Sequence, residues 1–459
     1  MTQKSKALGV FSLAMITAGS VDSIRNLPAT ALFGTHLIFF FLLGTIFFLL
    51  PTALVAAELA STSRRDGGIF AWVSDAMGLK TGYLAVWFQW IENVIWYPAI
   101  LSTLAATVGY LISPQLATNP YFLIAIILVC FWGVTLVNMA GMRMSAWVAN
   151  ICSVFGLLLP MSLIIGLALY WIMTGHVSVI HLTWHNWVPH DWSHVGIWVA
   201  LTGIMLSFCG MEIATVHTHE TRNPQRDYPR AMLLATVIIL VTLVSGSLAI
   251  AVVLPTGEIS LVAGIMQAFD AFFSAYHLSY ILPAVAFMLI LGLIGSVNNW
   301  AIAPTRGLAY ALKEVGSSSR FDQLNKHGAP ARLLVAQAVV VTVISLCYLM
   351  LPSVNAVYWL FTALASQIYM IMYVLMFIAA IILRKKAMDR RAGFMIPGGL
   401  FGLSLVAVLG LIGSLFTFFI GFFPPSDMGI QDPVRYEMLI WGGLILMVVI
   451  PWVWVVKKK

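Results

Sequence analysis

Four charged side chains stand inside long apolar stretches of this sequence, where charge is costly. Asp22 and Arg25 lie in the first stretch, Glu92 in the third and Glu212 in the sixth. A charged side chain at bilayer depth costs about 2.5–3.5 kcal/mol on insertion scales, so it persists mainly where it lines a polar cavity or an ion path. Three carboxylates and one guanidinium give a formal charge of −2. Such a cavity favours a cationic solute, a bound proton, or both.

The first and sixth stretches are each interrupted. Gly19-Ser20 interrupts the first, and Gly210-Met211-Glu212 interrupts the sixth. Broken helices free amide and carbonyl groups, which coordinate solutes in secondary transporters. Amides of the outer half of the first stretch face the break at a helix N-terminus, so they can accept a carboxylate. Carbonyls and carboxylates near the second break can hold an ammonium group.

Composition predicts the class of fold that must position these groups. Apolar residues make up 61% of the 459 residues and charged residues 9%, as is typical of a polytopic helical membrane protein. Runs of about 20 apolar residues, enough to cross a bilayer, recur along the chain. We expect one all-α domain over residues 1–459 with twelve transmembrane helices. The predicted spans are 7–33, 36–60, 81–113, 121–140, 143–174, 197–216, 231–254, 279–312, 332–351, 355–383, 398–422 and 437–456.

The net charge of +7 indicates topology and not a nucleic-acid partner. Apart from Arg25 and Arg435, the basic residues fall on alternate loops, and positive charge marks the cytoplasmic face. We therefore expect both termini in the cytoplasm, a bacterial inner-membrane location and contact with anionic lipid headgroups. The four cysteines are scattered and have no metal-binding spacing. We expect no metal and no cofactor.

The order of the two broken spans permits an inverted repeat. The first span starts inside and the sixth outside, so spans 1–5 (7–174) and spans 6–10 (197–383) have opposite orientations, as such a repeat requires. Spans 11 and 12 (398–456) lie outside the repeat. Two loops, one opening at Gly67 and one over 261–276, are predicted to hold short amphipathic segments.

Short motifs along almost the whole chain carry a family resemblance. The chain resembles the amino acid–polyamine–organocation (APC) transporters, and it is most similar to their bacterial glutamate/GABA antiporter branch. The motifs are Ile16-Thr17-Ala18, 67–74, Gly210-Met211-Glu212, 223–229, 263–267, Trp300 with Pro304-Thr305-Arg306-Gly307, and 396–399.

The resemblance implies a five-helix inverted repeat with a central site between spans 1, 3, 6, 8 and 10. It also implies alternating access, commonly as exchange of an amino acid for its decarboxylated amine. The substrate-binding residues expected on this basis are Ala18, Gly19, Ser20, Asp22, Ser23, Tyr97, Gly210, Glu212, Trp300 and Tyr369.

Two carboxylates are candidates for proton coupling. Glu212 matches the acidic position of the family's sixth-span motif, and it would bind a proton or an ammonium group. Alternatively, it stabilises the break by accepting backbone N–H bonds. Glu92 would carry a proton or contact substrate, or it would make only an interhelical hydrogen bond.

Asp22 and Arg25 depart from the small residues that are usual at the family's first break. They are three residues apart, so on a continuous helix they would share a face and could form an ion pair. Alternatively, Asp22 recognises an amine, while Arg25 recognises a carboxylate or seals the outer entrance. Leu206 stands where amine-exchanging relatives often have a bulky aromatic gate. We therefore place Arg25 and Leu206 among the gating residues.

Aromatic residues offer a further contact for an ammonium group. By resemblance, Trp300 flanks the substrate, and its face could attract a cation by about 0.5–2 kcal/mol. Tyr97 and Tyr369 are weaker candidates of the same kind. Ordinary packing is the alternative for all three.

Five of the ten histidines fall in the outer loop between spans 5 and 6: His176, His181, His185, His190 and His194. They would gain charge together as pH falls through about 6.5, the ordinary imidazole value. The loop is thus either an acid sensor or a solvated loop without a role.

Together these observations predict a secondary active transporter that exchanges an amino acid for an amine or a second amino acid, with a possible link to acid. The alternative is a proton-coupled amino acid symporter. A membrane sensor that binds a solute without moving it belongs to another class. An enzyme is not expected, because no nucleophile–base pair stands out. The oligomeric state is not predicted.

Overall fold

The structure is a computed structural model, and it is all-helical over the part of the chain that it describes. The described residues are 9–63, 67–141, 152, 154–180, 183, 186–189, 195–213, 221, 223–316, 320–386, 393–424 and 433–456. These residues contain no β-strand. The expected all-α fold is confirmed.

Helices follow the predicted spans closely. The first half contains α1 (Val10–Val21), η1 (Ile24–Asn26), α2 (Leu27–Ala31), η2 (Gly34–His36), α3 (Leu37–Gly44), η3 (Thr45–Leu49), α4 (Leu50–Thr62), α5 (Ile69–Met77), α6 (Leu79–Ile112), η4 (Pro114–Thr118), α7 (Pro120–Met139), η5 (Val154–Leu158) and α9 (Leu159–Met173). The second half contains α10 (Val195–Ser207), α11 (Pro224–Val253), η8 (Thr256–Glu258), α12 (Gly264–Ala275), η9 (Ser279–Ile281), α13 (Leu282–Glu314), α14 (Ala331–Ser345), η10 (Leu346–Leu349), α15 (Val354–Lys386), α16 (Gly399–Ile420) and α17 (Pro433–Val456). The two amphipathic segments predicted in loops are the short helices α5 and α12.

Ten helical stretches of the described chain are long and apolar enough to cross a membrane. They are Gly34–Thr62, Leu79–Ile112, Pro120–Met139, Val154–Met173, Gln225–Val253, Ser279–Glu314, Ala331–Leu349, Val354–Lys386, Gly399–Ile420 and Pro433–Pro451. The two remaining predicted spans are the broken ones. Helices α1, with 12 residues, and α10, with 13, are each too short to cross a hydrocarbon core of about 30 Å alone. The count of twelve spans therefore stays a prediction.

The first break lies later than the glycine predicted. Gly19 and Ser20 remain inside α1, and the Ser20 hydroxyl donates to the Ile16 carbonyl at 2.8 Å, an intrahelical bond. The helix ends where Asp22 (φ −69°, ψ 131°) and Ser23 (φ −147°, ψ 119°) turn extended. Aspartate competes with the helical backbone for hydrogen bonds, so it ends a helix more readily than a serine that bonds back along its own helix.

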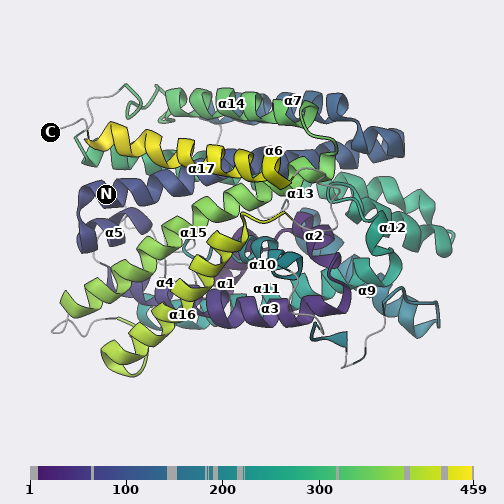
Figure 1. Ribbon diagram of the computed structural model, residues 1–459, viewed down its shortest axis with the longest axis horizontal. Helices are drawn as coiled ribbons and strands as arrows, with labels where there is room; N and C mark the ends of the chain where they lie inside the picture. The colour runs from purple at the N-terminus through teal and green to yellow at the C-terminus, as the bar shows by residue number, and fades with distance from the viewer. Residues whose placement is uncertain are drawn as a thin grey trace.

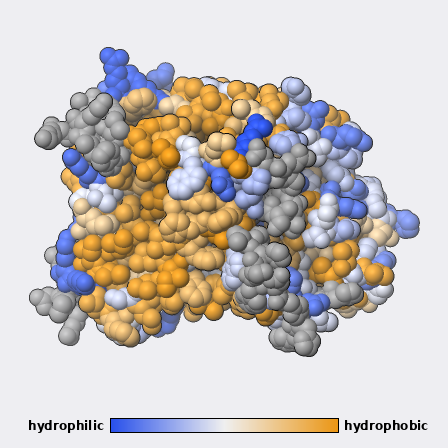
Figure 2. All heavy atoms as spheres, viewed as in Figure 1, coloured by the Kyte–Doolittle hydropathy of each residue, from blue (hydrophilic) through white to orange (hydrophobic). Residues whose placement is uncertain are grey.

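The long helices run side by side. In Figure 1, α6, α7, α13, α14 and α17 extend along the long axis, with α5 at the left end and α12 at the right. The most extensive packing joins α6 to α13 and α15, α15 to α16, and α1 to α11. Figure 2 shows apolar side chains across much of this face, with hydrophilic ones gathered toward the two ends. Large apolar side chains such as Phe401 and Tyr121 are 78% and 73% exposed, as expected where lipid covers them.

Two helices meet closely because each contributes a glycine. A Cβ built on Gly156 would lie only 2.1 Å from the Gly292 Cα, and one on Gly292 would lie 2.3 Å from the Gly156 carbonyl oxygen. Small residues allow close approach of helix backbones in membranes. This contact lets the span of η5 and α9 pack against α13.

We predict that Gly292→Ala destabilises the protein, since the added methyl must push two backbones apart. Such overpacking costs about 1–3 kcal/mol. The matched control is Gly166→Ala in α9, where a Cβ would meet nothing within 4 Å; there alanine should gain about 0.5–1 kcal/mol of helix stability. Apparent melting temperatures in detergent should diverge, and equal temperatures for the two variants would contradict this packing.

A buried ion pair joins three elements at one end of the molecule. Glu58 of α4 pairs with Arg384 near the end of α15, and both side chains are 7% exposed. The second guanidinium nitrogen of Arg384 donates to the carbonyls of Ile396 (2.9 Å) and Gly399 (3.1 Å). The other Glu58 oxygen accepts the Ile396 N–H at 2.7 Å. The pair thus ties α4 and α15 to the chain entering α16.

We predict that Arg384→Met costs about 3–5 kcal/mol, because it leaves the Glu58 carboxylate buried without its cation. The double variant Glu58→Leu with Arg384→Met removes both charges and should recover part of that loss. Thermal unfolding in detergent would compare the stabilities of the unaltered protein, the single variant and the double variant. A double variant no more stable than the single one would contradict the pairing.

Candidate functional site

A polar cavity lies where the two broken helices meet. It is lined by Ser20, Val21, Asp22, Ser23, Arg25 and Asn26 at the first break, by Leu206 and Cys209 at the second, and by Glu92, Asn93, Trp96, Ser296, Trp300 and Tyr369. The last six come from α6, α13 and α15, which are the third, eighth and tenth predicted spans. The structure therefore brings together the five spans that the family resemblance implied.

A second cavity adjoins the first. It shares Asp22, Ser23 and Ser296 with the first cavity, and it adds residues of η5 and α13 such as Gly156 and Asn299. Asp22 thus stands between two hollows. Gly19, expected at the substrate, lines this second cavity and not the first.

Glu212 fastens the second break to its neighbours. Its carboxylate accepts hydrogen bonds from Tyr369 (2.7 Å), Tyr373 (2.6 Å) and Gln89 (3.0 Å). The two tyrosines come from α15 and the glutamine from α6. Glu212 is 3% exposed and is not among the residues that line the cavity. These contacts agree with the stabilising interpretation: the three donors named are side chains, and the backbone N–H of Glu212 also bonds to the carboxylate.

Gly210 needs to be glycine. Its φ of 109° lies in a region that side chains disfavour, and its N–H donates to the Tyr373 hydroxyl at 2.8 Å. A Cβ at Gly210 would stand 3.5 Å from the Ser20 carbonyl oxygen and from the Trp300 ring. The two breaks and the aromatic side chain therefore lie close together.

Asp22 and Arg25 do not pair with each other. Asp22 accepts a hydrogen bond from Thr242 of α11 at 2.7 Å, and no ion pair joins Asp22 to Arg25 among the described residues. Asp22 follows the end of α1 in extended backbone and Arg25 lies in η1, so they share no helical face. The ion-pair alternative fails for this reason.

Arg25 is enclosed by aromatic rings. It is 1% exposed, and its guanidinium carbon lies 5.0 Å from the Trp96 ring centroid and 5.6 Å from that of Tyr358. It donates to the Tyr358 hydroxyl at 3.1 Å, and that hydroxyl donates to the Arg25 carbonyl at 3.1 Å. Cation–π contact of this kind stabilises a desolvated cation.

Glu92 lines the cavity, and no described residue makes the interhelical hydrogen bond to it that was one expectation. It is 3% exposed, and its Oε2 has no partner among the described residues. Arg25 lines the same cavity, and no ion pair joins it to Glu92 among the described residues.

The aromatic candidates separate into two groups. Trp300 and Tyr369 line the cavity, and the rings of Trp300 and Trp96 lie 6.0 Å apart. Tyr97 does not line it. Its hydroxyl donates to the Trp300 carbonyl at 2.7 Å and its ring packs on Phe131 at 4.7 Å, so it supports α13.

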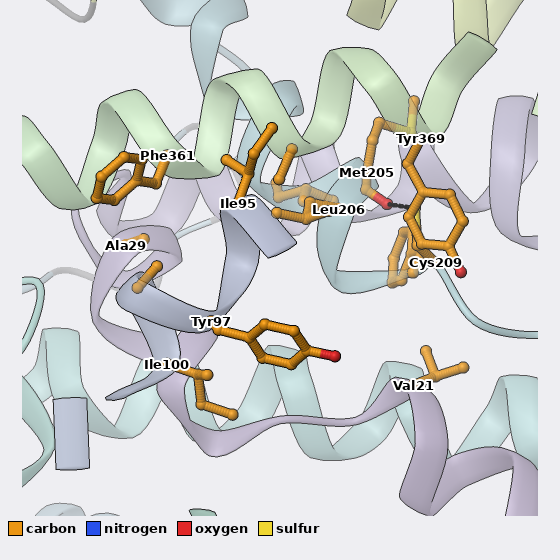
Figure 3. Packing of buried hydrophobic residues seen from close by; sticks show 14 of the residues in the cluster. Val21, Ala29, Ile95, Tyr97, Ile100, Met205, Leu206, Cys209, Phe361 and Tyr369 are labelled. Atoms are coloured by element: carbon orange, nitrogen blue, oxygen red, sulfur yellow. Dashed lines mark hydrogen bonds between the residues drawn. The ribbon is translucent and has the colours of Figure 1, made fainter. Parts of the chain in front are cut away.

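Figure 3 shows the apolar side of this region. Leu206, Cys209 and Tyr369 lie near one another, and a dashed line marks the bond from the Cys209 thiol to the Met205 carbonyl, 3.2 Å long. Leu206, expected to act in gating, borders the cavity, and Ala18, expected at the substrate, does not. Sequence reasoning did not select Trp96, Ser296 or Cys209.

The outer histidines are only partly described. His176 is exposed and stacks on Trp171 with ring centroids 4.3 Å apart. His181, His185, His190 and His194 lie outside the described residues. The acid-sensor hypothesis therefore stays open.

An all-helical membrane protein whose two broken helices enclose a polar cavity has the architecture of a solute transporter. Residues 8–450 match the model of the amino acid permease family. The chain belongs to this family, within the APC superfamily, and it is a multi-pass membrane protein.

Several proteins are similar to the chain over most of its length. An uncharacterized transporter of Legionella pneumophila is 39% identical over 100% of this chain and 98% of its own. A glutamate/gamma-aminobutyrate antiporter of Lactococcus lactis subsp. cremoris is 30% identical over 98% of this chain and 90% of its own. A probable agmatine/putrescine antiporter of Lactococcus lactis subsp. lactis is 22% identical over 87% and 84%. These relatives are transporters and not enzymes, and the last two carry small amino acids or amines in their names.

We predict that Tyr373→Phe lowers the apparent melting temperature more than Tyr369→Phe. The first removes bonds to Glu212 and to Gly210, while the second removes only a bond to Glu212. A hydrogen bond to a charged group is worth about 1.5–3 kcal/mol. In a Glu212→Gln background, Tyr369→Phe should lower the melting temperature less than it does in the unaltered protein. Tyr373→Phe should still lower it, because the bond from the Gly210 N–H is lost in either background. Equal effects of the two tyrosine variants in both backgrounds would contradict these assignments.

Proposed function

We propose that this permease is a secondary active transporter of the bacterial inner membrane that exchanges an amino acid for an amine or a second amino acid. The observation that supports this most is the central cavity, which residues of both breaks line. A site at this place can open to either side when the broken helices tilt. Both termini would be cytoplasmic, and residues 7–174 and 197–383 would form the inverted repeats.

The packing suggests how alternating access would work. Helix α1 packs on α11, while α6 packs on α13 and α15. The first break is held to α11 by the Asp22–Thr242 bond, and the second to α15 by Tyr369 and Tyr373. These bonds are made by side chains, so they can exchange without unfolding a helix. The first pair of helices can then rock against the second group around the bound solute.

Exchange is supported by the relatives, two of which bear the name antiporter. The alternative is a proton-coupled symporter, in which Glu92 or Glu212 would carry the proton. The two mechanisms differ in one requirement. An exchanger needs solute on the far side of the membrane, and a symporter needs a proton gradient.

We expect reconstituted protein to take up labelled amino acid into liposomes that hold unlabelled amino acid, and to take up little into empty ones. Counterflow at pH 5 and pH 7, with and without an ionophore that collapses the proton gradient, measures this directly. Equal uptake into empty vesicles that stops with the ionophore would establish the symporter instead. A difference between the two pH values in loaded vesicles would support a link to acid.

A further inference from the structure

Three charged side chains around the central cavity have polar atoms without a partner among the described residues. These atoms are Asp22 Oδ1, Glu92 Oε2 and Arg25 Nε. The side chains are 5%, 3% and 1% exposed, and all three line the cavity. A buried charged atom without a hydrogen bond is costly. The pattern therefore points to an occupant that supplies the missing partners.

The charges of these groups set the charge of that occupant. Two carboxylates and one guanidinium sum to −1. Glu212 differs from them because three donors already satisfy its oxygens. An occupant that pairs with all three groups must carry two cationic groups and one anionic group, with a net charge of +1.

The positions of the three charged groups indicate how the occupant would be oriented. Arg25 and Glu92 line the same cavity, yet no ion pair joins them among the described residues. The adjacent carboxylate and ammonium of an α-amino acid can fill that place, with the carboxylate on Arg25 and the ammonium on Glu92. Asp22 also borders the second cavity, where Glu92 and Arg25 are absent from the lining. It is placed to meet a second cation at the end of the side chain.

Building on the proposed transport function, we infer that the substrate is a cationic α-amino acid with a second positive charge on its side chain. A neutral amino acid leaves Asp22 unpaired, and an acidic one adds a carboxylate opposite it. A diamine leaves Arg25 without its anion. Exchange of one cationic amino acid for another is thus favoured over exchange for the decarboxylated product.

The test is counterflow into liposomes loaded with lysine, using labelled lysine, alanine, glutamate and the diamine cadaverine. We expect lysine to exchange at least about tenfold faster than each of the others at equal concentration, since one lost charged contact is worth about a factor of ten or more. Thermal stabilisation by each unlabelled solute in detergent provides a binding measurement that does not depend on transport.

Three variants assign the contacts. Asp22→Asn should abolish the preference for lysine over alanine, because only the side-chain cation loses its partner. Arg25→Gln should weaken the binding and exchange of lysine but not of cadaverine, which has no carboxylate. Glu92→Gln should weaken the binding and exchange of both lysine and alanine. Glu258→Gln, an exposed loop residue outside the site, is the matched charge-removing control and should behave as the unaltered protein.

The outcomes separate the two proposals. Stabilisation by lysine without any exchange would leave this inference standing and overturn the exchanger. Exchange of alanine or glutamate into liposomes loaded with that same solute, without uptake of lysine or thermal stabilisation by it, would do the reverse. Replacing sodium with choline in the buffer tests whether Asp22 binds a metal cation instead of the side chain of the substrate. If neutral amino acids move only with sodium, and Asp22→Asn removes that dependence, then Asp22 holds a metal cation and the inference fails.

Discussion

The structure depends on one constraint: backbone polar groups freed inside a membrane must find partners within the protein. Both broken helices meet this constraint with side chains from other helices. The Tyr373 hydroxyl accepts the Gly210 N–H and donates to Glu212, so one side chain serves both the backbone and the charge at the second break. At the first break, Tyr358 accepts from the Arg25 side chain and donates to its carbonyl. Both breaks are therefore stabilised by specific contacts, and residues of both line the central cavity.

The same constraint explains why the charges that remain unpaired are informative. Glu212 accepts hydrogen bonds from three donors, so the cost of its desolvation is offset. Aromatic rings and one hydroxyl surround Arg25, but its Nε has no partner among the described residues. Asp22 accepts from the Thr242 hydroxyl and the Ser23 backbone N–H, but its Oδ1 has no partner among the described residues, and neither has Glu92 Oε2. Some buried charges of this region thus have their partners within the protein, while other buried polar atoms lack one. A ligand in the cavity that supplies the missing partners would offset the free-energy cost of burying those atoms.

Much of this arrangement could be predicted from the sequence, but its partners could not. Hydropathy predicted the helices, and charge inside apolar stretches indicated Asp22, Arg25, Glu92 and Glu212. The position of the first break was wrong by about two residues, because glycine and serine are tolerated in a helix when the serine bonds back along it. Tyr358 lies 333 residues from Arg25, and it is one of 14 tyrosines. No local pattern distinguishes such a partner from a tyrosine that only packs.

Helix α15 links these features along one axis. Tyr358 near its start holds Arg25, Tyr369 and Tyr373 near its middle hold Glu212, and Arg384 near its end pairs with Glu58. At 1.5 Å per residue, the first and last of these contacts lie about 39 Å apart along the helix. A tilt of α15 relative to the first break would strain the contact at one end, while the buried ion pair resists movement at the other. In the proposed transport cycle, motion of this helix would therefore exchange hydrogen bonds at both breaks together, which would couple access to the cavity from the two sides.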